Sequence, residues 1–286
     1  AQTESATEQS RIDEIVVTAT KRATSLQDTA LSVSAISGAD LNKLGITSID
    51  QIIDTVPGIT VIDTGPGFSS VVFRGISTSS FGSKGIVSKY IDEFPFTSKN
   101  IEDIKLVDMA QVEVLKGPQG TLYGQSALGG VVRYITNKPT TDGIAGGFDL
   151  TYENVADGGD GYQGQGYINI PLSENVAVRA VLYNYDAPGF IDNLGTGSKD
   201  VNTEEVTGGR LALRWDISDR AAFNLLYFNQ AQSVGGGQGS GFQTASSTYT
   251  PVTGNGTPTD IAPPDLDNPT FRSNFDPLND IDLEAL

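Results

Sequence analysis

Three charged residues stand inside apolar, strand-like stretches of this sequence and are well placed to make specific polar contacts. Arg74 follows an apolar run, and Glu113 and Lys116 belong to the segment VEVLK. A charge among apolar neighbours needs a partner or water. We therefore expect these residues to form ion pairs, either within one domain or between two parts of the molecule.

The residue types that most often carry out catalysis are absent. The 286 residues include no histidine and no cysteine, which removes the commonest general base, the commonest metal ligand and any thiolate or disulfide site. No pair of carboxylates stands at a convincing catalytic spacing, and no glycine-rich stretch ends in Gly-Lys-Ser/Thr as a phosphate-binding loop does. We therefore expect a protein that is not an enzyme and that has no catalytic residue, cofactor or metal site.

The chain is strongly acidic, with 18 Lys and Arg against 35 Asp and Glu and a formal net charge of −17. Such a chain repels phosphate, so nucleic acid is not an expected partner. The acidity fits a secreted or surface protein. No stretch approaches the roughly 20 apolar residues of a membrane helix, which leaves a soluble protein or a β-barrel, whose membrane signal is weak in each strand.

A small α+β domain is expected to position the charged residues. Residues 31–36 have strand composition. Asp40 and Gly45 are expected to cap a short helix over Leu41–Leu44. A second helix is expected over 49–56, where isoleucine and valine recur on one face. Strand, helix, helix and further strands make an α+β order.

The most informative stretch is the glycine-rich run from Val112 to Pro139. Its two apolar runs, at 112–115 and 131–135, are expected to form strands joined by tight turns. Glycine is needed where the backbone takes a positive φ or lies close against another backbone. The run therefore indicates a compact, loop-rich sheet packed inside something larger; a generic glycine-rich β-meander is the alternative.

Four motifs in the first half of the chain resemble those of one family, in matching order. They are VPGITV at 56–61, FRGIS at 73–77, YIDEFPF at 90–96 and the whole glycine-rich run. All four resemble the plug domain of TonB-dependent outer-membrane receptors, over roughly residues 13 to 139. The fold class that this resemblance implies is a small α+β plug domain followed by the N-terminal part of an antiparallel transmembrane β-barrel.

A short β-prone island near the N-terminus looks like the TonB box, the segment that an energy-transducing partner captures by strand addition. It follows a polar tail, residues 1–12, that is expected to be disordered. The alternative is that the island is simply the first strand of the domain. The residues expected to bind the TonB-type protein are Asp13, Glu14, Ile15, Val16, Val17, Thr18 and Ala19.

The resemblance also implies contact sites within the plug. Arg74, Glu113 and Lys116 are expected to contact the barrel, although position 116 usually holds arginine in the family and lysine cannot make the bidentate arginine fork. Ordinary internal or surface charges are the alternative. Two glycine-bearing loops are expected to contact the ligand, with mere connection of strands as the alternative. Their residues are Gly65, Pro66, Gly67 and Phe68, and Ser79, Ser80 and Phe81.

After Pro139 the pattern changes to segments of about ten residues with period-two alternation, the length that a tilted membrane strand needs. Each has one apolar face and one more polar face, as expected for lipid outside and a hydrated lumen inside. Short turns alternate with long polar connections, and residues from 233 onward are expected to be mostly loop. A soluble sandwich is the alternative. The five strands expected are Gly147–Glu153, Tyr162–Pro171, Asn175–Asp186, Gly209–Ile217 and Ala222–Gln230.

Taken with the resemblance, these patterns predict a TonB-dependent receptor in the outer membrane of a Gram-negative bacterium, with the plug and N-terminus facing the periplasm. Its partners would be a TonB-type protein, outer-membrane lipid and a scarce ligand, first a ferric siderophore. Vitamin B12, haem or carbohydrate, or a soluble plug-like binding or signalling module, are the alternatives. About five strands cannot close a barrel, so we expect a fragment of a longer protein. The expected divisions are a tail (1–12), the box (13–19), the plug (20–139) and a partial barrel (140–286).

Overall fold

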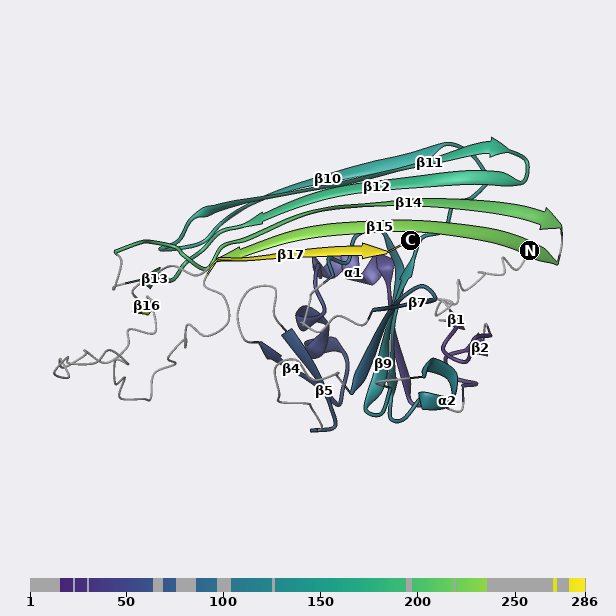
Figure 1. The fold of residues 1–286 in the computed structure, drawn as a ribbon, viewed down its shortest axis with the longest axis horizontal. Helices are drawn as coiled ribbons and strands as arrows, with labels where there is room; N and C mark the ends of the chain where they lie inside the picture. The colour runs from purple at the N-terminus through teal and green to yellow at the C-terminus, as the bar shows by residue number, and fades with distance from the viewer. Residues whose placement is uncertain are drawn as a thin grey trace, which may run out of the picture.

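A computed structural model describes most of the chain, and Figure 1 shows a long curved sheet arched over a smaller α+β domain. We call the curved sheet the wall sheet and the described residues before 140 the N-terminal domain. The described residues are 16–22, 24–29, 31–63, 69–75, 86–96, 104–124, 127–193, 197–218, 220–235, 270–271 and 278–285.

The N-terminal domain is built on a five-stranded mixed sheet in the order β3-β8-β9-β6-β7. β6 and β9 are parallel, and the other neighbours are antiparallel. A separate hairpin is formed by β4 (Ile59–Asp63) and β5 (Ser69–Phe73). The strands of the main sheet are β3 (Val33–Ser37), β8 (Met109–Lys116), β9 (Gly130–Thr136), β6 (Val87–Ile91) and β7 (Phe94–Phe96).

Both expected helices exist, but one begins earlier and the other is tighter than predicted. α1 runs over Gly38–Leu44, and its N-cap is Ser37, whose hydroxyl accepts a hydrogen bond from the Asp40 N–H at 3.1 Å. The predicted cap, Asp40, instead lies in the first turn, where a carboxylate is favourable. Gly45 ends the helix with φ of 66°, as predicted. The second helix is a 3₁₀ helix, η1, over Asp50–Thr55.

Within the ranges described above, no helix is long and apolar enough to cross a membrane.

The glycine-rich run forms the centre of the domain. β8 and β9 are the two predicted strands, and they pair antiparallel. Between them lies a short helix, α2 (Gly120–Tyr123), where only turns were expected. Gly130 lies so close to β8 that a Cβ there would sit 2.5 Å from the Leu115 carbonyl oxygen and 2.8 Å from the Phe73 ring. The glycine at 130 is therefore required by packing and not by backbone conformation.

The wall sheet has six strands in the order β10-β11-β12-β14-β15-β17, all antiparallel to their neighbours. Five of them match the five strands predicted from the sequence. The sixth, β17, was predicted to be loop, because its short, aspartate-rich sequence has a low β-propensity. The strands are β10 (Ala145–Asn154), β11 (Asp160–Ser173), β12 (Val176–Ala187), β14 (Glu204–Ser218), β15 (Ala221–Gly235) and β17 (Leu278–Ala285).

The predicted alternation of faces is confirmed along β12, β14 and β15. Leu182, Leu211 and Phe223 are exposed on the outer face, whereas Tyr183 and Ala212 are buried on the inner face. The tight turns after β11 and β14 lie at the same end of the sheet, on the right in Figure 1. Beyond the opposite end, two residues of β13 (Asp192–Asn193) pair with β16 (Thr270–Phe271).

One apolar cluster joins the two parts of the molecule. Leu41 of α1 and Phe73 of β5 belong to the same buried cluster as Ala212, Leu226 and Phe228 of the wall sheet. In Figure 1, α1 lies directly under the wall sheet. Because burial of apolar surface is non-directional, this cluster holds the two parts together, and polar contacts must fix their orientation.

We predict that Gly130→Ala lowers the free energy of unfolding by about 1–3 kcal/mol, the usual cost of overpacking a well-packed site. The added methyl would collide with the Leu115 carbonyl and the Phe73 ring. Thermal denaturation of the purified protein, followed by circular dichroism, measures the loss. Gly120→Ala is the matched control, since a Cβ there meets nothing within 4 Å; equal effects at the two positions would contradict the prediction.

Candidate functional site

A buried ion pair lies at the centre of the N-terminal domain. Glu113 of β8 and Arg133 of β9 face each other across the sheet, and the Arg133 Nη1 to Glu113 Oε2 distance is 2.7 Å. Their side chains are 0% and 2% exposed. A buried charge that loses its partner is strongly destabilising, so each residue depends on the other. Glu113 was expected from the sequence to need a partner, and Arg133 was not considered. Arg133 carries the same signal, because it too is a charge inside an apolar strand.

The N-terminal segment docks on this ion pair. The Thr18 backbone N–H donates to Glu113 Oε1 at 2.5 Å, and Arg133 Nη1 donates to the Thr18 hydroxyl at 2.7 Å. Gln111 Nε2 donates to the Val16 carbonyl at 3.1 Å and to Glu113 at 2.8 Å. One residue of the segment therefore forms hydrogen bonds with both members of the pair. We call Thr18, Gln111, Glu113 and Arg133 the latch cluster.

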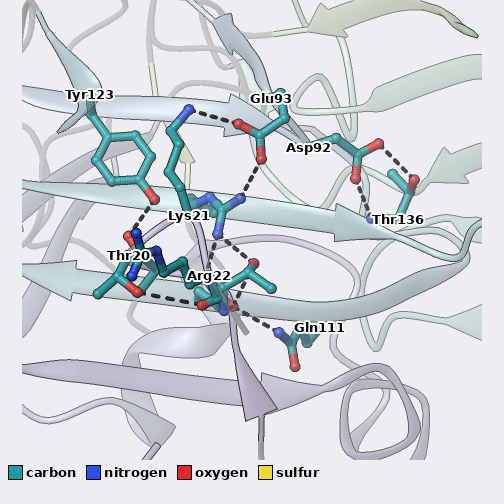
Figure 2. Close-up of polar contacts among 12 residues, drawn as sticks. Thr20, Lys21, Arg22, Asp92, Glu93, Gln111, Tyr123 and Thr136 are labelled. Carbon is teal, nitrogen blue, oxygen red and sulfur yellow. Dashed lines mark hydrogen bonds and ion pairs between the residues drawn. The ribbon is translucent and has the colours of Figure 1, made fainter. Parts of the chain in front are cut away.

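Aromatic and charged side chains enclose the docked segment. The Tyr123 hydroxyl of α2 donates to the Ala19 carbonyl at 2.7 Å, and the Tyr90 hydroxyl donates to the Tyr123 carbonyl at 2.5 Å. Lys21 pairs with Glu93 at 2.8 Å, and Glu93 also accepts from Arg133 at 2.9 Å. Figure 2 shows Lys21, Glu93 and Tyr123 grouped at this site. Burial raises the pKa of Tyr123 to about 12, with the charge of Arg133 acting in the opposite direction.

The predicted TonB box is described only from Val16 onward; Asp13, Glu14 and Ile15 lie outside the described residues. Val16 and Val17 form β1 (Val16–Val17), which pairs with β2 (Thr24–Ser25). Val16 is 47% exposed, whereas Val17 and Ala19 are fully buried. The structure therefore places the end of the predicted box inside the domain and leaves Val16 at its surface. In Figure 1, β1 and β2 lie on the right-hand side of the N-terminal domain, above α2.

The three residues expected to contact the barrel lie in different surroundings. Glu113 belongs to the latch cluster, and all of the contacts given above for it are within the N-terminal domain, because the buried Arg133 and Thr18 occupy its carboxylate. Arg74 is exposed in the turn after β5, with φ of 49°. Lys116 is partly buried near Arg74: its pKa is lowered by burial and by the Arg74 charge. A barrel contact for Arg74 and Lys116 stays a prediction.

Polar contacts between the domain and the wall sheet come from residues that the sequence analysis did not single out. Asp108 binds Arg179 of β12 and Arg210 of β14, each with a shortest N–O distance of 2.6 Å. Lys105 binds Glu204 of β14 at 2.9 Å. These three ion pairs join a segment just before β8 to the inner face of the wall sheet. The two loops expected to contact ligand, 65–68 and 79–81, lie outside the described residues.

The structure thus has an α+β domain held against the inner face of a curved antiparallel sheet whose outer face is apolar. This is the arrangement of a plug inside a barrel wall. Residues 25–131 match the family model described as the TonB-dependent receptor plug domain. The chain is thus a TonB-dependent receptor plug domain followed by part of the barrel, as the sequence resemblance predicted.

Curated and structural relatives agree with this assignment. The chain is 30% identical over 213 residues to the pesticin receptor of Yersinia pestis, covering 72% of this chain and 30% of that protein. The crystal structure of the ferric yersiniabactin uptake receptor of Yersinia pestis superposes with a TM-score of 0.59 at 25% identity, over 72% of this chain and 32% of the other. The ferripyoverdine receptor from the outer membrane of Pseudomonas aeruginosa shares the fold, with a TM-score of 0.66 at 22% identity over 86% and 30%.

The chain spans about 30% of the length of the curated relatives that it matches. These relatives are named as receptors and not as enzymes. The localisation predicted from the sequence, the outer membrane of a Gram-negative bacterium, is that of this family.

We predict that Glu113→Gln lowers the free energy of unfolding by about 3–5 kcal/mol, because it leaves the buried Arg133 charge without its closest partner. It should also release the docked segment, which a spin label on a Val16→Cys variant would detect as increased mobility. Glu93→Gln is the matched control: this carboxylate also binds Arg133 but is 60% exposed, so its loss should cost less than about 1 kcal/mol. Equal losses of the free energy of unfolding in Glu113→Gln and Glu93→Gln would contradict the predicted role of the buried ion pair.

We predict that docking of the segment weakens as pH rises from 10 through 12. The phenol of free Tyr123 has a pKa near 10, and the pKa in the folded protein is about 12. A pKa raised on folding contributes stability below the unfolded value, and this contribution is lost as pH rises through the folded value. The mobility of the same label, measured against pH, should rise in this window.

Tyr123→Phe should remove this pH-dependent step, since the titrating hydroxyl is gone. Tyr90→Phe is the control, because it deletes a neighbouring hydroxyl and leaves Tyr123 in place. An unchanged alkaline step in Tyr123→Phe would assign the titration to another group.

Proposed function

We propose that this chain is the N-terminal part of a receptor that takes up a scarce ligand across the outer membrane, using energy delivered by a TonB-type protein. The observation that carries the proposal is the segment at residues 16–19, docked on a buried ion pair inside a plug-like domain. A segment that lies beside the main sheet, and that is not one of its strands, can be withdrawn without dismantling that sheet.

Capture of the segment would begin at its exposed end. We infer that residues 13–19 are the TonB box and that the partner adds a strand at Val16, whose side chain faces solvent. In the described part of the chain, β1 has one strand neighbour, the two-residue β2, so few strand hydrogen bonds have to be exchanged when a partner adds by β-augmentation. The affinity would come from main-chain hydrogen bonds, and Val17, which is fully buried, would have to leave the domain with the captured strand.

Withdrawal of the segment would act directly on the latch cluster. Thr18 donates to Glu113 from its backbone N–H and from its hydroxyl, and the hydroxyl accepts from Arg133. When Thr18 leaves, the two charges keep each other but lose these hydrogen bonds in a buried place, where unmade bonds are costly. Tension at the box is thereby delivered to β8 and β9, the central strands of the plug.

A ferric siderophore is the cargo class that we propose. The support is one solved relative at 25% identity, a ferric yersiniabactin uptake receptor. The plug loops at 65–68 and 79–81 are proposed to contact this cargo, and Arg74 with Lys116 to pair with carboxylates on the part of the wall beyond this chain. We also propose the divisions that the sequence predicted: a tail that ends at residue 12, a TonB box that ends at 19, a plug that ends at 139 and a partial barrel after it.

We predict that deleting residues 13–19 from the full-length receptor abolishes uptake and leaves ligand binding unchanged. The box is needed for energy transfer, whereas ligand contacts are made by other parts of the plug and barrel. Accumulation of radioactive iron from a panel of ferric siderophores by iron-starved cells measures uptake, and the same assay in de-energised cells measures binding.

Deletion of residues 3–9, a segment of equal length in the polar tail, is the matched control and should leave uptake intact. Normal uptake after loss of 13–19 would refute the box assignment. Failure of the intact receptor to bind any ferric siderophore would refute the cargo class and leave the box assignment standing.

A further inference from the structure

Two arginines on the inner face of the wall sheet converge on one carboxylate. Arg179 donates to Asp108 through Nε at 2.8 Å and Nη2 at 2.6 Å, a two-pronged contact with both carboxylate oxygens. Arg210 donates through Nη2 to Asp108 Oδ2 at 2.6 Å. The register explains the convergence: Val181, two residues beyond Arg179 on the same face, is paired with Arg210. The two guanidinium groups are therefore diagonal neighbours on one face.

The site is dry and carries an excess of positive charge. The Arg179, Arg210 and Asp108 side chains are 10%, 3% and 5% exposed. Two cations therefore share one carboxylate. The nearby acidic side chains are already engaged, Asp92 with Thr136 and Lys138, and Glu204 with Lys105. A buried site with two guanidinium groups and one carboxylate attracts a second anion, or an anion that binds the two guanidinium groups more strongly than Asp108 does.

The carboxylate that Arg179 binds and all of the acceptors described here for Arg210 belong to the plug. Besides the Asp108 carboxylate, Arg210 donates to the backbone carbonyls of Val107 at 3.3 Å and Asp108 at 3.0 Å. Its Nε is buried and has no acceptor among the described residues. Arg179 stacks on the Tyr167 ring, with its guanidinium carbon 4.0 Å from the ring centre. If the 104–108 segment moves away, the wall keeps two oriented guanidinium groups and loses their acceptors.

Asp108 is held so that its carboxylate points at the wall. It adopts φ of 52°, an uncommon conformation for a residue other than glycine. Its carbonyl accepts from the Asn137 N–H at 3.1 Å, and its carboxylate accepts from Asn137 Nδ2 at 2.8 Å. A strained backbone that is held from both sides is consistent with a side chain placed for one contact.

We propose that Arg179 and Arg210 form a carboxylate-binding site on the inner wall. The Asp108 carboxylate fills it while the plug is seated, and a carboxylate group of the passing cargo fills it when the 104–108 segment is displaced. Guanidinium forks match the planar, two-oxygen geometry of a carboxylate. The inference rests on the proposed uptake function for the displacement, and it adds that carboxylate-bearing cargo is favoured.

The wall site is tested in the purified full-length receptor with acetate as the probe. Asp108→Ala empties the position between the two arginines, so acetate should raise the melting temperature of this variant by about 2 °C or more over chloride at equal ionic strength. The wild-type receptor should not respond, since Asp108 occupies the site. A variant that adds Arg179→Gln and Arg210→Gln to Asp108→Ala should lose the response. Equal effects of acetate and chloride on Asp108→Ala would overturn the site.

The role in uptake is tested with Arg179→Lys, which keeps the charge and loses the fork. Uptake of ferric citrate, a carboxylate complex, should fall about ten-fold relative to a ferric trihydroxamate without a free carboxylate, as expected for one charged hydrogen bond. Binding of both complexes at the cell surface should be unchanged. An equal loss for the two complexes would overturn the cargo preference. If the wild-type receptor takes up neither complex, the proposed preference for carboxylate-bearing cargo is overturned, and the acetate experiment still decides whether the wall site exists.

Discussion

The buried pair of Glu113 and Arg133 is the interaction on which the rest of the plug depends. Neither charge can be left alone in a site that is almost completely closed to water, since an unpaired buried charge costs more than the pair contributes. The pair therefore fixes how β8 and β9 are aligned, and it also creates two hydrogen-bonding positions that Thr18 fills. Stability of the central sheet and occupancy by the N-terminal segment are set by the same four side chains, which explains how a peripheral strand can be coupled to the core.

A second set of charges orients the plug relative to the wall. The apolar cluster that includes Leu41 and Phe228 brings the two parts together without selecting one orientation. Asp108 selects it, because its carboxylate has to meet two arginines from different strands. Lys105 and Glu204 add a second point of contact, and two points prevent rotation about the first. The latch cluster thus lies near the middle of β8, whereas the Asp108 contacts lie just before β8 begins.

The sequence predicted the classes of element well and the partners of the charges poorly. Period-two alternation placed Leu211 and Phe223 on the outer face, since each strand carries its own pattern. Glu113 was recognised as a charge that needs a partner, but Arg133 and Thr18 were not, because pairing across a sheet is set by register and not by spacing. Asp108 gave no signal, since its partners lie 71 and 102 positions away. β17 was missed because pairing with β15, rather than propensity, makes it a strand.

The order of the strands has a consequence for how the molecule is assembled. Each wall strand from β10 to β15 pairs with the next wall strand in the chain, so the wall can grow one hairpin at a time through contacts of short range, which form quickly. The plug precedes the wall in the sequence and is made first. Asp108 is thus already present when Arg179 and Arg210 are added to the sheet, and its carboxylate can bind both arginines on the growing inner surface. The plug then acts as a template on which the wall sheet folds.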